Sequence, residues 1–256
     1  MNKRVLSTLA IATVTLGLGA AAIASTAVTP PAQRWSFDGM FGTFDRAAAQ
    51  RGFQVFEESC HACHALKFVA FRNLTDLGFT PDQVVQIASK YEVTAGPNDE
   101  GEMFQTPAKP ADHMPSPFAN DQAARVANNG ALPPDLSLIV DARVGGANYV
   151  YAVLTGYHDP APDGFVVNPG MYFNEYFAGH QIAMPPPLTD DRVTYTDGTK
   201  ATVSQMAHDV VTFLSWASEP NMEERKRLGI KVILFLIVMT GFLYALKRQI
   251  WSDVSH

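Results

Sequence analysis

The sequence contains little cysteine: Cys60 and Cys63 are the only two among 256 residues. A structural zinc site normally needs a second pair of soft ligands, usually cysteines, and the chain has no such pair. A thioredoxin-like dithiol should follow a strand of a βαβ unit, and it would have no use for the next histidine, His64. The scarcity of cysteine therefore disfavours both kinds of site.

The segment Cys60-His61-Ala62-Cys63-His64 has the spacing of a covalent haem-attachment motif. One turn of helix holds both sulfurs on the same side, where each can form a thioether with a haem vinyl group. His64 then directs its imidazole at the iron from one face of the ring. If both cysteines bind haem in this way, no thiol remains for a disulfide.

Basic residues are scarce between Ser25 and Met222, where 11 Lys and Arg stand against 22 Asp and Glu, a net charge of −11. The remaining eight basic residues lie near the N-terminus and around a C-terminal apolar run. A domain this acidic is not expected to bind nucleic acid. It should repel anionic lipid and attract basic proteins.

Charge is absent from a long N-terminal run between Val5 and Ala24, which follows the basic pair Lys3-Arg4. The run ends in Ala22-Ile23-Ala24, the small-x-small pattern that signal peptidases accept. We predict a signal peptide over residues 1–24. The alternative is an uncleaved membrane anchor, because the run is long for a signal sequence. Export of the domain is consistent with the haem-attachment motif, because c-type haem attachment in bacteria is expected to be completed outside the cytoplasmic membrane.

A second long run, Leu228 to Leu246, carries one charged residue, Lys231. Its 19 residues would span about 28 Å as a helix, close to the roughly 30 Å of a bilayer core. We predict a transmembrane anchor over 228–246. Both flanks are basic, so their charge does not determine the orientation of the anchor in the membrane; the location of the haem does. We therefore predict that residues 25–222 form a periplasmic haem domain and that 247–256 form a cytoplasmic tail.

Two helices are expected to form the centre of the domain. The first runs from Arg46 to about Ser59 with Asp45 as its cap, and the second from Val203 to Ser218. Gly52 lies inside the first helix, where glycine costs about 1 kcal/mol relative to alanine. Its presence suggests that another backbone crosses closely there, and in soluble c-type cytochromes the crossing element is the last helix of the domain.

The rest of the domain reads as loops with short elements. The fold class is therefore mainly α, a c-type cytochrome domain with long loop insertions, a small β-hairpin and one C-terminal transmembrane helix. Asp197-Gly198 is the turn signal for the hairpin. Short helices are expected over 81–90, 120–128, 137–144 and 147–155, and an exposed irregular segment over 94–118.

An iron bound by His64 on one face needs a second axial ligand if the protein is to be a pure electron carrier. Met184 precedes Pro185, which with the next two prolines stiffens the backbone so that the loop can direct a thioether at the iron. An open sixth position would instead permit peroxidase or ligand-binding chemistry. The other candidate ligands are Met114, His113, His158, His180 and His208.

Several longer segments together resemble the cytochrome c1 family, the membrane-anchored haem subunits of quinol–cytochrome c oxidoreductase (the cytochrome bc complex), in its alphaproteobacterial form. They cover essentially the whole mature chain in the family's order. These segments are WSFDGMFGTFDRAAAQRGFQVFEESCHACHAL, ALPPDLS, DARVGGANYVYAVLTGY, QIAMPPPL and TDGTKATVSQMAHDVVTFLSWASEP, ahead of the C-terminal anchor.

The resemblance implies roles for particular residues. It favours Met184 as the axial ligand opposite His64, and it matches Arg125 to an arginine that pairs with a haem propionate. It also places Pro133-Pro134 in the pocket wall on the histidine side, with a carbonyl accepting the Nδ1–H of His64. The chain departs from the family in one respect, because it has no cysteine left for a disulfide that some relatives are thought to carry.

The function implied is one-electron transfer by one covalently bound haem c. The electron would come from a Rieske iron–sulfur protein, with a cytochrome b subunit as neighbour, and would pass to a basic c-type cytochrome. The chain would be a carrier in an oxidoreductase of the bacterial inner membrane, not an enzyme on its own. The alternatives are a membrane-bound five-coordinate haem enzyme or gas sensor, and a stand-alone membrane electron carrier.

Overall fold

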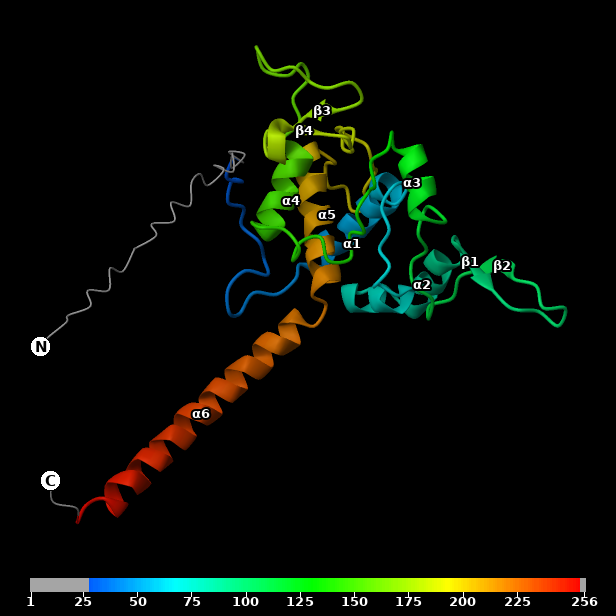
Figure 1. Ribbon diagram of the computed structural model, residues 1–256. Coiled ribbons are helices and arrows are strands. Elements are labelled where there is room, and N and C mark those ends of the chain that lie inside the picture. Colours follow the sequence, from blue (N-terminus) through cyan, green and yellow to red (C-terminus); the bar gives the residue numbers. More distant parts are fainter. Residues whose placement is uncertain (1–27, 254–256) are drawn as a thin grey trace, which may run out of the picture.

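The computed structural model describes residues 28–253, and these form a mainly helical domain from which one long helix extends (Figure 1). The predicted signal peptide, 1–24, lies outside the described residues. Two small antiparallel sheets pair β1 (Glu92–Ala95) with β2 (Phe104–Pro107) and β3 (Tyr172–Phe173) with β4 (Gln181–Ile182). The α-helices are α1 (Arg46–Val55), α2 (Pro81–Ala88), α3 (Asp121–Ala127), α4 (Gly146–Thr155), α5 (Val203–Ser218) and α6 (Met222–Ile250).

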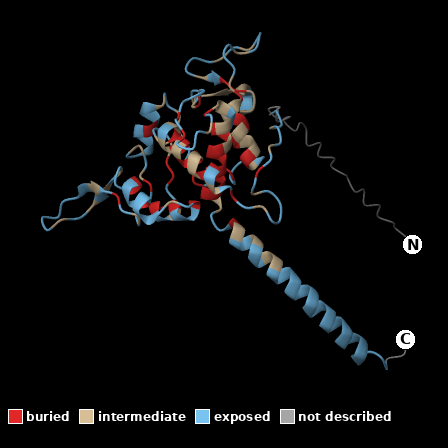
Figure 2. Cartoon of the chain, turned by 180° about the vertical axis from the view of Figure 1, so that it is seen from behind, coloured by how far each residue is buried: buried red, intermediate tan, exposed pale blue. Residues whose placement is uncertain are grey.

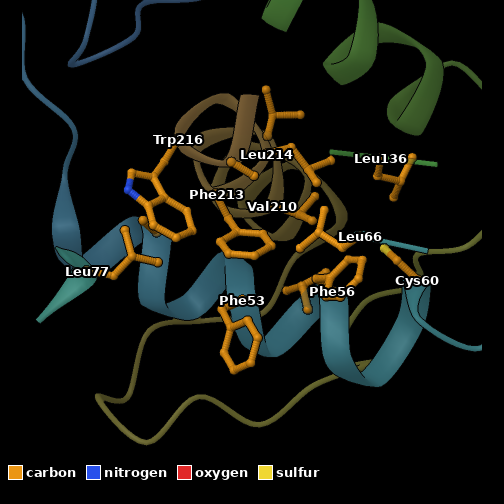
Figure 3. Packing of buried hydrophobic residues seen from close by; sticks show 14 of the residues in the cluster. Phe53, Phe56, Cys60, Leu66, Leu77, Leu136, Val210, Phe213, Leu214 and Trp216 are labelled. Carbon is orange, nitrogen blue, oxygen red and sulfur yellow. The ribbon is translucent and has the colours of Figure 1, made fainter. Parts of the chain in front are cut away.

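The core is organised around the crossing of α1 and α5, as the sequence predicts. A Cβ atom at Gly52 would lie 2.0 Å from the backbone oxygen of Asp209 and 2.8 Å from the Cβ of Phe213. Only glycine lets the two backbones approach this closely. Phe53, Phe56 and Phe213 meet across the crossing (Figure 3).

A buried ion pair fixes the same crossing. The side chain of Asp209 on α5 is fully buried, and its carboxylate accepts hydrogen bonds from Nε and Nη2 of Arg51 at 2.9 and 3.0 Å. Arg51 also donates from Nη1 to Asp197 at 2.9 Å. These hydrogen bonds to Asp209, with the charges of the two carboxylates, raise the pKa of Arg51, so the guanidinium stays charged and ties α1 to α5.

Most of the short helices begin where their capping residues predict. Asp45 accepts a hydrogen bond from the Ala48 amide, and Thr80 and Asn120 cap α2 and α3 in the same way. The first helix changes form before its predicted end: α1 stops at Val55 and continues as a π-helical turn, Phe56–Cys60. A 3-10 helix over Phe71–Leu77 precedes α2, and another short one covers Ala178–His180.

The predicted helix over 137–144 is wrong, because this segment forms a series of turns. The side chain of Asp135 accepts a hydrogen bond from the Ser137 amide, and Ser137 Oγ accepts one from the Phe68 amide at 3.1 Å. The Leu136 amide donates to the carbonyl of Ala65 at 2.9 Å. The segment therefore bonds to the chain after His64 instead of closing a helix of its own.

The hairpin predicted around Asp197-Gly198 is also wrong in position. A turn is present, with Gly198 at φ +79°, but no strands flank it, and the two-stranded sheets lie elsewhere. Gln54 of α1 donates to the carbonyl of Thr194, and Tyr195 is buried in the core. The Thr194 carbonyl therefore bonds to α1, and Tyr195 packs in the core, where a hairpin would have paired this strand with its neighbour.

The predicted anchor is part of α6, a continuous helix of 29 residues. It is long and apolar enough to cross a membrane, and none of its most apolar 18-residue stretch is buried (Figure 2). Exposure of this kind is unlike a soluble core helix and fits membrane anchoring. Its first residue, Met222, is buried with the core, so the helix begins inside the domain and leaves it within two turns.

Candidate haem-attachment site

The π-helical turn carries the chain from α1 into the cysteine motif. The His61 amide donates to the carbonyl of Phe56 at 2.8 Å, and the amides of Cys63 and His64 both donate to the carbonyl of Cys60, at 3.1 and 2.9 Å. One tight turn therefore holds both cysteines and His64. Single π-helical turns of this kind are frequent at functional sites, because they redirect the side chains that follow.

The two thiols differ in environment. Cys60 is 8% exposed and lies among the core side chains Phe56, Leu66 and Leu136 (Figure 3), whereas Cys63 is exposed. Burial raises the pKa of the Cys60 thiol to about 12. A redox dithiol needs a thiolate with a lowered pKa, so this pair is unsuited to thiol–disulfide exchange.

His64 is held by one of its two ring nitrogens. Nδ1 lies 2.8 Å from the carbonyl oxygen of Pro134, which can only accept a hydrogen bond, so Nδ1 carries the proton. Burial lowers the pKa of His64, which favours the neutral ring. The Nε2 lone pair is then free to bind a metal, and a hydrogen bond of this kind fixes the tautomer and orients the ring.

The wall behind the histidine is a segment joined by hydrogen bonds to the residues that follow the motif. The amide of Lys67 donates to Asp135 Oδ2 at 3.1 Å, beside the bonds from Phe68 to Ser137 and from Leu136 to Ala65 described above. The chain on both sides of Pro134 is thereby fixed against the residues after His64. The carbonyl that orients the ring is consequently set by the fold.

Met184 lies two residues after the end of β4. Tyr157 donates from its hydroxyl to the Met184 carbonyl at 3.1 Å, and the side chain of Met184 is half-buried. Burial raises the pKa of Tyr157, so the hydroxyl keeps its proton and remains a donor. The loop is thus fixed by a hydrogen bond on one side and by Pro185 and its two neighbours on the other.

Arg125 lies on α3 with an exposed side chain that donates to the carbonyl of Gly130 at 3.1 Å. Within residues 28–253, neither Arg125 nor Met184 forms a hydrogen bond with the Cys60–His64 turn. The structure therefore brings His64 and Pro134 together, as the resemblance implies. It leaves the roles of Met184 and Arg125 as predictions.

The rival ligands are engaged in other contacts. Met114 is 1% exposed and belongs to the core, the usual place for a methionine. The rings of the four histidines also have partners: His113 with the Lys67 carbonyl, His180 with the Glu175 carbonyl, His158 with the Glu175 carboxylate, and His208 stacked on Trp35.

The donor set fits an iron carried by a haem. In the part of the chain that the structure describes, no group of three or more His, Cys, Asp and Glu could hold a bare metal ion. A haem iron needs only axial ligands from the protein, since the ring supplies the other four. Two thiols in one turn beside an imidazole with a free Nε2 meet that requirement.

Sequence reasoning missed the residues that hold the site from behind. Asp135 and Ser137 could have been recognised, because an aspartate two residues before a serine is a common side chain–backbone turn. Tyr157 could not, since nothing in a single sequence pairs its hydroxyl with a carbonyl 27 residues away.

Over residues 28–253, the fold and the site define a class of protein: a helical domain with one haem-attachment turn, followed by a C-terminal helix that is long and apolar enough to cross a membrane. The profile of the Cytochrome C1 family matches residues 35–254. Cytochrome c1 of Rhodospirillum rubrum is 51% identical over the full length of both chains. Cytochrome b/c1 of Bradyrhizobium diazoefficiens is 49% identical over 89% of this chain and 36% of its own. The mitochondrial cytochrome c1 heme protein of Saccharomyces cerevisiae is 47% identical over 88% and 73%. The chain belongs to the Cytochrome C1 family.

Proposed function

We propose that this chain is the electron-transferring haem subunit of a quinol–cytochrome c oxidoreductase. The family to which it belongs and the names of its relatives support a haem protein of electron transport that is a subunit of the bc1 complex. It carries one covalently bound haem c. The observation that carries the proposal is the Cys60–His64 turn, in which Nδ1 of His64 donates to Pro134 and leaves Nε2 free.

Each side chain has a stated task in this proposal. Cys60 and Cys63 would form the two thioethers, and His64 would be an iron ligand. Met184 would be the second iron ligand, on a loop that Tyr157 and the prolines hold in place. Arg125 would pair with a propionate, for which its guanidinium keeps N–H donors besides the one bound to the Gly130 carbonyl.

When bound, the haem supplies a one-electron couple of iron, Fe³⁺/Fe²⁺. The protein tunes that couple by the identity of the axial ligands and by burial of the ring. A thioether ligand favours the reduced iron and raises the potential, whereas a neutral imidazole held by Pro134 is a fixed ligand that needs no reorientation. No acid–base or nucleophilic group is required, which suits a carrier within an enzyme complex.

The partners follow from the same proposal. A Rieske iron–sulfur protein would supply the electron, a cytochrome b subunit would lie beside the anchor, and a basic c-type cytochrome would accept the electron. The haem domain would lie on the periplasmic side of a bacterial inner membrane, because c-type haem is attached there. The net charge of −11 between residues 25 and 222 supports a basic acceptor.

A pair of methionine variants tests the ligand. Met184→Leu should leave the haem attached through its thioethers, while the midpoint potential falls by more than about 0.1 V, within the range that axial ligands control. Met114→Leu replaces a buried methionine of the core and should leave the potential unchanged. The measurement is an optical redox titration of both variants; an unaltered potential in Met184→Leu would show that Met184 is not the ligand.

Carbon monoxide separates this function from the five-coordinate alternative. The reduced protein should resist carbon monoxide while a methionine caps the iron, and Met184→Leu should bind it. Ready binding by the unmodified protein would favour a ligand-binding or peroxidase role instead. Extraction in detergent followed by identification of co-purifying subunits distinguishes a complex subunit from a stand-alone carrier.

A further inference from the structure

An apolar loop tip is exposed at the end of the domain from which α6 leaves. The 36–43 loop begins and ends at buried aromatic residues, Trp35 and Phe44, which are 7% and 5% exposed. At its tip, Met40 and Phe41 are 59% and 80% exposed. Single exposed apolar side chains are common on protein surfaces, but these two are adjacent and lie at the end of the domain from which α6 leaves.

The first turns of α6 hold the loop in place. The ammonium group of Lys226 donates to the carbonyls of Phe37 and Gly42, at 2.7 and 3.2 Å, so one charge binds both sides of the tip. The carboxylate of Glu223 accepts a hydrogen bond from the Phe44 amide at 2.9 Å. These contacts cross more than 170 positions of sequence and fix the loop to the membrane helix.

The loop is also rigid in itself. Phe37 stacks on Trp35 with ring centroids 5.5 Å apart and contacts Phe44 at 5.2 Å. A Cβ atom at Gly42 would lie 2.1 Å from the backbone oxygen of Asp38, so the chain reverses through a turn that only glycine permits. The positions of Met40 and Phe41 are therefore set by the stem and by α6.

The tip lies where the anchor becomes apolar. The loop descends beside the first turns of α6 in both views of the molecule (Figures 1 and 2). The apolar run of α6 starts at Leu228, two residues after Lys226, and Arg225, Arg227 and Lys231 surround that start. Aromatic and basic side chains together are typical of the layer between lipid headgroups and acyl chains.

We propose that the 36–43 loop is a second membrane contact, in which Met40 and Phe41 insert into the interfacial layer of the lipid bilayer. The occupant of this apolar surface is lipid, because the loop is bound to the first turns of α6, whose following apolar stretch is exposed. The charges support the same choice: the domain is strongly acidic, whereas in the first ten residues of α6 four basic side chains outnumber Glu223 and Glu224, which suits anionic headgroups.

Lipid photolabelling tests this contact. The full-length haem-loaded chain is reconstituted in vesicles of phosphatidylcholine and phosphatidylglycerol that contain a phosphatidylcholine with a diazirine on its acyl chain. After irradiation, the tryptic peptide between Arg34 and Arg46 should carry label. The peptide of residues 144–192, which contains Val166 at 83% exposed, should carry none, although it too exposes apolar side chains.

A variant and a second membrane make the outcome decisive. Met40→Ser/Phe41→Ser should lose the label from the loop peptide, while labelling of α6 stays unchanged. The experiment is repeated in native membranes, where partner subunits are present. Label on the loop peptide in both membranes supports the proposal. Absence of label in vesicles overturns it, and so does label in vesicles alone, since the tip would then be covered by protein in the assembly.

Discussion

At the scale of single residues, the site is defined by which atom of each side chain is already engaged. His64 has Nδ1 committed to Pro134 and Nε2 free, so one hydrogen bond leaves the ring able to bind a metal through Nε2. Met184 has its backbone, not its sulfur, committed to Tyr157. Met114 has its whole side chain committed to the core. The two methionines therefore differ in whether the side chain is available to bind a metal.

Tyr157→Phe should weaken the hold on the proposed ligand without removing it. Loss of the hydroxyl removes one hydrogen bond to the Met184 carbonyl, worth about 1 kcal/mol. The methionine should then leave the iron more often, so carbon monoxide should bind the reduced variant several-fold faster than the unmodified protein.

Tyr172→Phe is the matched control, because Tyr172 is 42% exposed and forms no side-chain hydrogen bond in the described structure. Stopped-flow mixing of the reduced proteins with carbon monoxide measures the rates. Equal rates in the two variants would mean that Tyr157 does not position the ligand loop.

At the scale of elements, the sequence predicted what depends on periodicity and caps. The crossing of α1 and α5 was foreseeable from Gly52 and from the apolar stripe of 203–218, and the helix starts from Asp45 and Thr80. The failures at 137–144 and 193–202 share a physical cause. In both segments a group bonds to a distant element: the hydroxyl of Ser137 to the amide of Phe68, and the carbonyl of Thr194 to Gln54 of α1. Local propensity contains no information about such partners.

The candidate site shows the same division. The haem-attachment motif was predicted from the residue types and spacing of Cys60, Cys63 and His64. The contact between His64 and the Pro134 carbonyl was predicted from the family resemblance. The supports that depend on long-range contacts, Asp135 and Tyr157, became visible only in the structure.

Gly52→Ala should destabilise the domain strongly. Its new Cβ would overlap the backbone of α5, which cannot move far because Arg51 and Asp209 bind across the same crossing. Overpacking of this kind typically costs about 1–3 kcal/mol, and a clash with backbone belongs at or above the upper end. Thermal unfolding followed by circular dichroism should show a clearly lower midpoint.

Gly229→Ala provides the comparison within a helix. A Cβ at Gly229 meets nothing within 4 Å, so this change should leave the unfolding of the domain unaltered. A Gly52→Ala protein as stable as the Gly229→Ala protein would contradict the close crossing.

At the scale of the whole molecule, the charges are unevenly distributed. The acidic residues of the domain include Asp99, Glu100 and Glu102 at the tip of the β1–β2 hairpin, which projects from the body (Figure 1). Asp190 and Asp191 follow the Met184 loop instead. A basic cytochrome that approaches the proposed ligand loop would meet this second pair first, whereas the hairpin tip acts at a distance.

Electron transfer to a basic cytochrome should slow as salt rises. The Debye length falls from about 30 Å at 0.01 M to about 10 Å at 0.1 M, which removes long-range attraction. Asp190→Asn/Asp191→Asn should lower the rate at low salt more than neutralisation of the hairpin tip does. Asparagine at position 190 retains an oxygen that can accept from the Val203 amide, as Asp190 does at 2.8 Å.

Stopped-flow oxidation of the reduced protein measures both effects. A rate independent of salt, or equal in the two sets of variants, would refute steering by these charges and leave the haem assignment untouched.

Because α6 is one unbroken helix, the orientation of the whole protein should depend on the thickness of the bilayer. Its 29 residues are about 43 Å long, and the 19 from Leu228 to Leu246 match a hydrocarbon core of roughly 30 Å. A helix in a thinner bilayer reduces its hydrophobic mismatch by tilting. Because Glu223 and Lys226 fasten the domain to the first turns of this helix, a tilt of the helix turns the domain with it. The angle of the haem plane, measured by linear dichroism in oriented bilayers, should therefore change between short-chain and long-chain lipids; a constant angle would mean a hinge between domain and anchor.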